Sequence, residues 1–178
     1  MKRLLLIDDE PNVLSALKRV LTPAFSNDGL VVETFGDPYA ALIRGSEVAF
    51  DAVLSDYRMP KMDGVAFLKQ FRLLQPDTPR MILSATTDFD TLMAAVNEAA
   101  IQHYLVKPWS EEELVSSVRE ALDRYAAIVS ERELADQARV SQGTMTEEER
   151  EMRRLEVEEP GITKVRRADD GSVLLDDL

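Results

Sequence analysis

Four short apolar runs, separated by helical patterns, constrain the fold of this chain more than any other feature of its sequence. They are Leu4–Ile7, Ala52–Ser55, Met81–Leu83 and Tyr104–Val106. Runs of this length suit buried strands, and strands that alternate with helices predict βα units around a parallel sheet. With a further strand expected at Leu30–Phe35, the fold class is α/β, with a five-stranded, doubly wound parallel sheet.

Helical signals fill the gaps between these strands. Proline or aspartate at the first turn predicts helices at residues 11–21, 37–44, 63–74 and 88–100. After the last strand, Ser110 and Glu113 form a capping box, and good helix formers continue from there to about Arg139. This last helix is longer than the sheet needs, so an extended C-terminal helix is expected.

The chain is expected to divide into three parts. Residues 1–125 would form the domain that contains the sheet, and residues 126–145 a helical extension or linker. Residues 146–178 would form a short acidic helix followed by a small β-hairpin. Thr146 and Glu149 match a second capping box, which predicts where the acidic helix begins.

Two features of this C-terminal part have more than one interpretation. Apolar residues spaced three and four apart form a coiled-coil-like seam at Val115, Val118, Leu122, Tyr125 and Val129. The seam either packs on the sheet or, in its projecting part, joins two copies of the chain. The turn signal Asp169-Asp170-Gly171 predicts a hairpin, which is marginal in water unless it packs on another surface.

Composition narrows the classes of partner. The 178 residues have a net charge of −12, which disfavours direct binding to nucleic acid. Cysteine is absent, so disulfides and thiolate metal sites are excluded. No apolar run approaches the roughly 20 residues that cross a membrane, and the apolar start is too short for a signal peptide. A cytoplasmic protein without a membrane partner is expected.

Five polar side chains stand at or just after the ends of the apolar runs: Asp8, Asp9, Asp56, Ser84 and Lys107. Ligands of parallel sheets bind outside the carboxyl ends of the strands, so these groups are expected to meet. Like charges ~4 Å apart repel by about 4 kcal/mol at an effective dielectric near 20, which a divalent cation would offset. Oxygen ligands favour Mg²⁺, with Mn²⁺ or Ca²⁺ as alternatives.

The same groups suit the transfer of a phosphoryl group. The ammonium of Lys107 and the hydroxyl of Ser84 can donate hydrogen bonds to phosphoryl oxygens. Asp56 is then available as a carboxylate nucleophile, activated by proximity and charge neutralisation.

In their order, four motifs resemble those of the receiver domain of two-component response regulators. The motifs are Ile7-Asp8-Asp9-Glu10, Asp56-Tyr57-Arg58-Met59-Pro60 with Asp63-Gly64, Ser84-Ala85-Thr86, and Lys107-Pro108. The resemblance covers about residues 1–125 and implies a flavodoxin-like receiver fold. It also implies two partners: a sensor histidine kinase or phosphotransfer protein, and a downstream protein whose identity the sequence does not give.

The resemblance implies a role for each acidic residue of the site. Asp56 would accept the phosphoryl group from phosphohistidine or from a small phosphodonor. Asp9 would bind Mg²⁺ directly and Asp8 mainly through water, while the Asp56 carboxylate and the backbone carbonyl of Arg58 complete the metal ligands.

The remaining positions would control the response. Lys107 would pair with the phosphoryl oxygens, and the Lys107-Pro108 peptide would be cis. Ser84 and Tyr104 would be the switch residues, which turn toward the site on activation. Arg58 and Thr86 would tune how fast water removes the phosphoryl group.

Three functions remain open. The first is a phospho-accepting response regulator, which is not an enzyme apart from self-phosphorylation and slow autodephosphorylation. The second is a non-phosphorylated receiver-like scaffold that acts through the long C-terminal helix. The third is a phosphohydrolase of the haloacid-dehalogenase type, but Asp8-Asp9-Glu10 lacks its Asp-x-Asp spacing. The tail shows no helix-turn-helix or catalytic pattern, so the output is expected to be protein–protein contact, including a homodimer.

Overall fold

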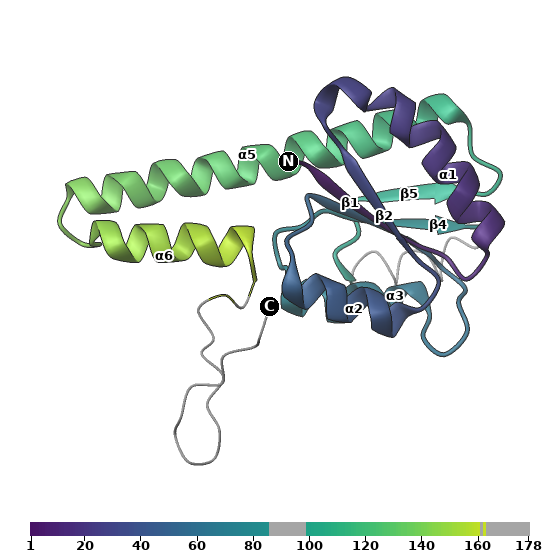
Figure 1. Cartoon of the computed structure of the whole chain (residues 1–178), viewed down its shortest axis with the longest axis horizontal. Coiled ribbons are helices and arrows are strands. Elements are labelled where there is room, and N and C mark those ends of the chain that lie inside the picture. Colours follow the sequence, from purple (N-terminus) through teal and green to yellow (C-terminus); the bar gives the residue numbers. More distant parts are fainter. Residues whose placement is uncertain (86–98, 161, 163–178) are drawn as a thin grey trace, which may run out of the picture.

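The computed structural model describes residues 1–85, 99–160 and 162, and its centre is a sheet of five parallel strands. The strands lie in the order β2-β1-β3-β4-β5 (Figure 1). This is the order of flavodoxin-like doubly wound sheets, whose ligands bind where the order reverses, beside β1 and β3. The strands are β1 (Arg3–Ile7), β2 (Val31–Phe35), β3 (Ala52–Asp56), β4 (Arg80–Ser84) and β5 (His103–Val106).

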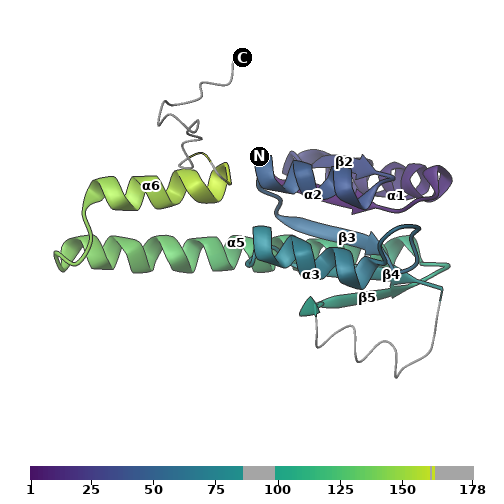
Figure 2. The ribbon, with the colours of Figure 1, turned by 90° about the horizontal axis from the view of Figure 1, so that it is seen from below.

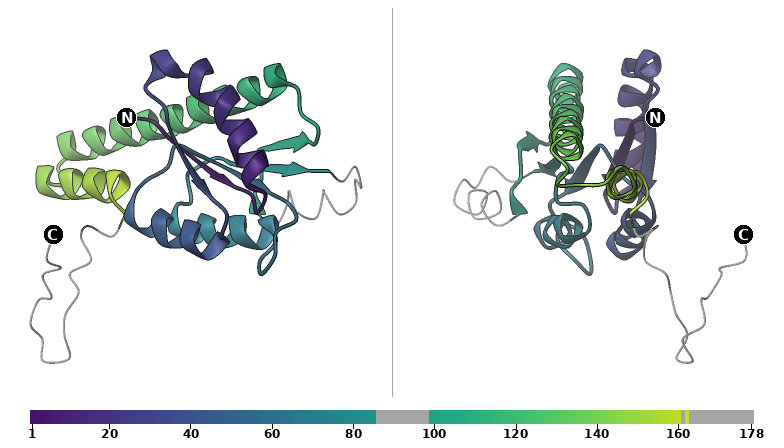
Figure 3. Two further views of the ribbon diagram at one scale, coloured as in Figure 1. Left: turned by 45° about the vertical axis from the view of Figure 1, so that its right-hand side comes forward. Right: turned by 90° about the vertical axis from the view of Figure 1, so that its left-hand side faces the viewer.

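In the described part of the chain, two helices cover each face of the sheet. α1 (Pro11–Ala24) and α5 (Glu111–Ser141) lie on one face, and α2 (Pro38–Glu47) and α3 (Gly64–Leu74) on the other (Figure 3, right). A short 3₁₀ helix, η1 (Ser26–Asp28), follows α1. The helix predicted at residues 88–100 falls almost entirely outside the described residues. The α/β fold with a five-stranded, doubly wound parallel sheet and a long C-terminal helix is confirmed.

Alternation along β1 supplies both halves of the core. Leu4 and Leu6 pack with α1 and α5, whereas Leu5 and Ile7 pack with α2 and α3. Successive side chains of a strand point to opposite faces, so one strand contributes to both layers. All four are at most 1% exposed, as expected of a sheet covered on both sides.

The helices begin where the sequence predicts. Each predicted cap side chain accepts a hydrogen bond from a backbone N–H in the first turn of its helix, at Asp37, Asp63, Ser110 and Thr146. α1 continues to Ala24, three residues beyond the predicted end at Leu21. Pro23 therefore lies inside its last turn, which is still closed by a hydrogen bond from the Phe25 N–H to the Leu21 carbonyl.

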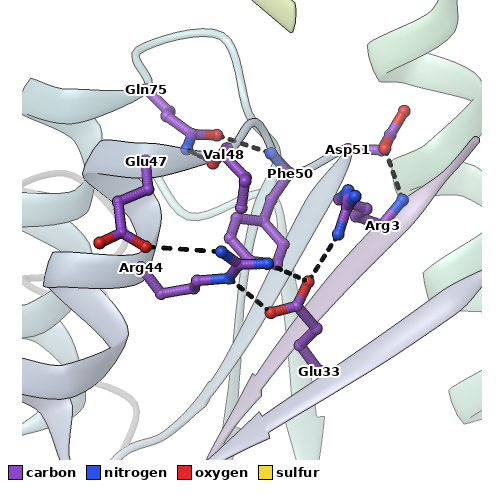
Figure 4. A network of polar contacts seen from close by, with 8 residues as sticks. All are labelled: Arg3, Glu33, Arg44, Glu47, Val48, Phe50, Asp51 and Gln75. Atoms are coloured by element: carbon purple, nitrogen blue, oxygen red, sulfur yellow. Dashed lines mark hydrogen bonds and ion pairs between the residues drawn. The ribbon is translucent and has the colours of Figure 1, made fainter. Parts of the chain in front are cut away.

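Polar contacts fix the amino-terminal edge of the sheet, away from the predicted site (Figure 4). Glu33 of β2 binds both Arg3, at 2.8 Å, and Arg44 of α2, at 2.9 Å. The hydrogen bond from Arg44 lowers the pKa of Glu33 despite its partial burial. The backbone N–H of Arg3 donates to Asp51 at 2.6 Å, and Gln75 joins the ends of α2 and α3 through the carbonyls of residues 45 and 48. These contacts anchor the strands at the edge where no ligand is expected.

Beyond the sheet, α5 continues without a break through residue 125, the predicted limit of the first domain, and turns back as α6 (Glu147–Glu158) (Figure 2). Gly143, with φ of +71°, lies in the turn, where a left-handed conformation favours glycine. α5 has 31 residues. Neither it nor any other helix in the described part of the chain is apolar enough to cross a bilayer.

A buried carboxylate joins the two helices of this α5–α6 hairpin. Asp136 of α5 is 4% exposed, and its Oδ1 accepts hydrogen bonds from Arg139 at 2.9 Å and from Arg153 of α6 at 3.3 Å. No residue of α6 is itself buried. Asp136 therefore provides a polar contact between the two helices of the hairpin.

Replacing Asp136 with alanine is expected to release α6 from α5. The two arginines that it pairs with would lose their shared partner, at a cost of about 1.5–3 kcal/mol for hydrogen bonds to a charged group. Amide exchange in α6 should accelerate by roughly tenfold or more, since 1.4 kcal/mol corresponds to a factor of ten. Glu131→Ala, an exposed carboxylate on the same helix, is the control. Equal exchange in the two variants would contradict the role given to Asp136.

The hairpin also contacts the base of the sheet domain. Arg132 of α5 pairs with Asp77, which follows α3. Beside this pair, a cavity of about 320 Å³ is lined by the ends of α2 and α3, by Tyr125 and by the last residues of α6. Burial raises the pKa of Tyr125 to about 12. The hairpin is thus attached to the domain at its base rather than only through α5.

Candidate functional site

Three of the predicted site residues meet at the carboxyl edge of the sheet. The Nζ of Lys107, which follows β5, lies 2.8 Å from Asp8 Oδ2 and 2.6 Å from Asp56 Oδ1. Asp8 follows β1 and Asp56 ends β3, so the neighbouring strands position both carboxylates. Their exposed fractions are 1% and 6%. The chain has therefore buried two acids around one cation.

Backbone N–H groups hold the second oxygen of each carboxylate. Asp8 Oδ1 accepts a hydrogen bond from the Glu10 N–H at 2.8 Å. Asp56 Oδ2 accepts one from the Arg58 N–H at 2.7 Å. Hydrogen bonds to a charged oxygen are stronger than neutral ones, so these donors fix the direction in which each carboxylate faces. Neither donor could be predicted from the sequence, because every residue except proline has a backbone N–H.

Burial and pairing act in opposite directions on the charges of the site. Burial raises the pKa of Asp56 above its ordinary value, although Lys107 opposes this through a hydrogen bond and its charge. Burial alone would lower the pKa of Lys107, but its hydrogen bonds to Asp56 and Asp8 outweigh it and raise that pKa. Lys107 thus stays protonated, and its charge keeps Asp56 more acidic than burial alone would leave it.

Of the two predicted switch residues, Ser84 contacts Lys107 and Tyr104 lies on β5, the strand that leads to Lys107. Ser84 ends β4 and is 3% exposed, and its carbonyl accepts a hydrogen bond from the Lys107 N–H at 2.8 Å. Tyr104 of β5 is half-buried and packs against the core on the side of α2 and α3. The Lys107-Pro108 peptide is cis, as the resemblance implies. The hydrogen bond from the Lys107 N–H connects the backbone of Lys107 to the strand that ends in Ser84.

Not every predicted side chain lies in the buried centre. The side chains of Asp9 and Arg58 are exposed, and Arg58 meets Asp56 through its N–H. Thr86 lies outside the described residues. Among residues 1–85, 99–160 and 162, no three acidic or histidine side chains are close enough to form a complete metal site. Lys107 lies between the two carboxylates that are gathered.

The residues nevertheless fit Mg²⁺. Two buried carboxylates at one point supply only oxygen, which hard cations prefer. Mg²⁺ in proteins usually takes one or two carboxylates and keeps several waters, so it does not require a third acid. Asp8 and Asp56 meet that requirement, and Asp9 is adjacent to Asp8 in sequence. These oxygen donors are therefore suitable for Mg²⁺, with water completing the coordination.

A glycine sets how closely α3 approaches the site. A Cβ atom on Gly64 would lie 2.0 Å from the carbonyl oxygen of Asp56, closer than non-bonded atoms can come. The Gly64 N–H also donates to the Tyr57 carbonyl at 2.9 Å. In the sequence, Asp63-Gly64 indicates only the start of a helix. The close approach depends on tertiary contacts, which that pattern does not contain.

Gly64→Ala is expected to destabilise the fold by about 1–3 kcal/mol, the usual cost of overpacking. The clash falls on backbone of the residue that bears the candidate nucleophile, so no side chain can move aside to relieve it. Urea denaturation would measure the loss. Gly36→Ala is the matched control, because its Cβ would lie at an ordinary 3.9 Å from the Asp8 carbonyl. Similar losses at positions 64 and 36 would argue against this constraint.

Sequence relatives share this part of the chain. The hydrogenase transcriptional regulatory protein HoxA of Bradyrhizobium diazoefficiens is 41% identical over 122 residues, which are 68% of this chain and 24% of HoxA. The transcriptional regulatory protein PrrA of Mycobacterium leprae is 37% identical over 125 residues, 70% of this chain and 52% of PrrA. The chain thus spans about a quarter to a half of these relatives.

A solved structure and a family model agree with them. The signal receiver domain of an HD domain-containing protein from Pseudomonas fluorescens Pf-5 superposes with a TM-score of 0.67 at 29% identity, covering 72% of this chain and 92% of that one. The family model of the response regulator receiver domain matches residues 4–119, which include Asp8, Asp56 and Lys107. Residues 4–119 are therefore a receiver domain, and the chain belongs to the response regulator receiver family.

Proposed function

We propose that this chain is a phospho-accepting response regulator in which Asp56 receives a phosphoryl group from a sensor histidine kinase or a phosphotransfer protein. The observation that supports this most directly is the contact of Lys107 with two buried carboxylates, at 2.6 and 2.8 Å. Such an arrangement places a cation beside the nucleophile, and this cation opposes the rise in pKa that burial causes at Asp56. A cytoplasmic location, where a kinase can present its phosphohistidine, is part of the proposal.

In the proposed reaction, a carboxylate oxygen of Asp56 attacks phosphorus. The new P–O bond forms as the P–N bond to the donor imidazole breaks, and the imidazole nitrogen keeps the electron pair. The Arg58 N–H holds the other oxygen of Asp56 and thereby directs the attack. Lys107 lies within reach of the phosphoryl oxygens, where its charge stabilises the transferred group.

Receiver domains generally use Mg²⁺, and we propose the same requirement here. Asp8, Asp9, Asp56 and the backbone carbonyl of Arg58 would hold the ion. When bound, Mg²⁺ supplies charge neutralisation for the acidic cluster and the phosphoryl oxygens. The side chain of Asp9 is exposed, and direct binding of the ion would place its carboxylate beside Asp8 and Asp56.

We further propose that Ser84 and Tyr104 convert phosphorylation into a change of surface. Phosphorylation adds about two negative charges, and Ser84 ends the strand beside Asp56. Tyr104 lies on the next strand, opposite Ile82. Moving such a switch from mostly off to mostly on requires about 5.5 kcal/mol of differential stabilisation. Arg58 and Thr86 are proposed to tune the lifetime of the phosphoryl group.

The proposed output is contact with a downstream protein or with a second copy of the chain. The α5–α6 hairpin projects from the receiver domain and offers the surface for it (Figure 1). Receiver domains are generally not enzymes, and we propose no turnover here beyond self-phosphorylation and slow loss of the phosphoryl group. Direct binding to nucleic acid or a membrane forms no part of the proposal.

Incubation with acetyl phosphate and Mg²⁺ tests this function. One covalent phosphoryl group per chain is expected by intact mass. Beryllofluoride with Mg²⁺ should change the fluorescence of Trp109, the single tryptophan, which lies two residues after Lys107 and packs against the core under α1 and α5. A protein that gains no mass and shows no fluorescence change would instead be a scaffold that works without phosphorylation.

A further inference from the structure

A groove of about 340 Å³ runs between α5 and α6, on the hairpin rather than on the receiver domain. Its apolar lining comes from Val129 and Leu134 of α5 and Val157 of α6. Leu134 is 64% exposed, which is unusual for a leucine beside a neighbouring helix. The groove therefore offers apolar surface that the hairpin itself does not cover.

Arginines dominate the charge of the same groove. Four arginines line it against three acidic residues, although the whole chain has a net charge of −12. Arg150, Arg153 and Arg154 each pair with a carboxylate of the hairpin, yet their side chains remain 38%, 57% and 51% exposed. A guanidinium has five N–H donors, so each can bind a further carboxylate. An apolar floor edged with arginine suits a peptide that combines leucine with aspartate.

We propose that this groove binds residues 169–178 of the same chain. That segment reads Asp-Asp-Gly-Ser-Val-Leu-Leu-Asp-Asp-Leu, with four aspartates, three leucines and no basic residue. Its leucines match the lining of the groove, and its aspartates match the arginine edge. In a chain rich in glutamate, this is a segment in which acidic and bulky apolar residues stand side by side.

The length of the connection allows this binding within one molecule. Eight residues, 161–168, separate Pro160 from the segment, and eight residues can span about 26–29 Å. α6 has 12 residues and is about 18 Å long. A short tether gives an effective concentration in the millimolar range, so modest complementarity is sufficient. The proposal does not depend on the phosphorylation of Asp56.

Paired cysteines test it in the full-length protein, because the native chain has none. Ser130 lines the groove and Ser172 lies in the segment, so the S130C/S172C variant should form an intramolecular disulfide on mild oxidation of a dilute sample. The control is S15C/S172C, since Ser15 is an exposed residue of α1. A yield about tenfold above the control is expected from the tethered site. Equal yields, or disulfides between chains in the dilute sample, would overturn the proposal.

Charge reversal shows whether the proposed pairing produces the cross-link. In the S130C/S172C background, R154E should lower the yield several-fold, and D176K with D177K should do the same. Combining the two changes should restore it, because opposite charges again face each other. Raising the ionic strength to about 1 M, where the Debye length is ~3 Å, should weaken the wild-type cross-link. If the cross-link yield fell in both variants and did not recover when the changes were combined, the loss would not come from pairing between the groove and the tail. That result would overturn the proposal.

Discussion

Asp56→Asn is expected to abolish covalent phosphorylation by acetyl phosphate and Mg²⁺. The amide is nearly the same size as the carboxylate and can still accept the hydrogen bond from the Arg58 N–H at 2.7 Å. It lacks the anionic oxygen that attacks phosphorus, so the fold is kept while the nucleophile is lost. Intact mass spectrometry of both proteins under identical conditions measures the effect. Glu112→Gln removes an exposed carboxylate and should leave phosphorylation unchanged.

The same substitution should alter the dependence of stability on pH. Burial raises the pKa of Asp56 in the folded protein, whereas the unfolded chain has an ordinary value of about 3.9. Below that value both states bind the proton. As the pH rises through the raised pKa of the folded protein, wild type loses stability, because its carboxylate ionises less favourably in the fold. Asp56→Asn lacks this loss, so its free energy of unfolding should exceed that of wild type at neutral pH.

If the Asp56→Asn protein were still phosphorylated, another residue would have to be the acceptor of the phosphoryl group. Asp8 is the nearest alternative, since it shares Lys107 with Asp56. Peptide mapping would identify the modified residue. If the variant took up the phosphoryl group at the wild-type rate, Asp56 would not be the acceptor and the proposed function would lose its central residue. Loss of phosphorylation with an unchanged far-UV circular dichroism spectrum would support Asp56 as the acceptor.

The sheet was predictable because its signals are local. Most of the strands are short apolar runs, and the helices that follow begin at signals that the sequence shows: Pro11 at the start of α1 and a capping side chain before α2, α3 and α5. The strand ends in turn placed Asp8, Asp56 and Lys107 at one edge. Asp9 was expected at the same point, but successive side chains at a strand end point in different directions, and that of Asp9 faces solvent.

The arrangement of the C-terminal hairpin could not be read in the same way. Helix formers predict the length of α5, and a capping box predicts the start of α6. Nothing in the spacing shows that α6 returns along α5, that Asp136 is buried between them, or that Arg132 meets Asp77, 55 residues away in sequence. An aspartate and an arginine in a helix normally face water. Their pairing depends on how the helices pack, which local patterns do not determine.

Lys107→Met should destabilise the protein at neutral pH by about 3 kcal/mol, the low end of the range for removing one partner of a buried ion pair. Methionine keeps most of the apolar stem but removes the charge that serves both carboxylates. Asp8 and Asp56 would then remain buried at 1% and 6% exposure without their cation. Chemical denaturation in a metal-free buffer measures this loss.

Lys61→Met is the matched control, because Lys61 pairs with Asp37 at the same 2.8 Å distance but on the surface. Water screens exposed ion pairs, so the loss of stability there should be small. Similar losses of stability at positions 61 and 107 would show that the buried ion pair contributes no more to stability than the exposed one.

Mg²⁺ and acid should both reduce the penalty of Lys107→Met, for the same electrostatic reason. A divalent cation can replace the missing ammonium between the two carboxylates, so Mg²⁺ should raise the melting temperature of the variant more than that of wild type. Lowering the pH toward the raised pKa of Asp56 should protonate that carboxyl group and narrow the difference between the variant and wild type. A penalty that neither Mg²⁺ nor acid changes would come from lost packing of the lysine stem. In that case the main role of Lys107 would be packing, and neutralising the charges of Asp8 and Asp56 would contribute little to stability.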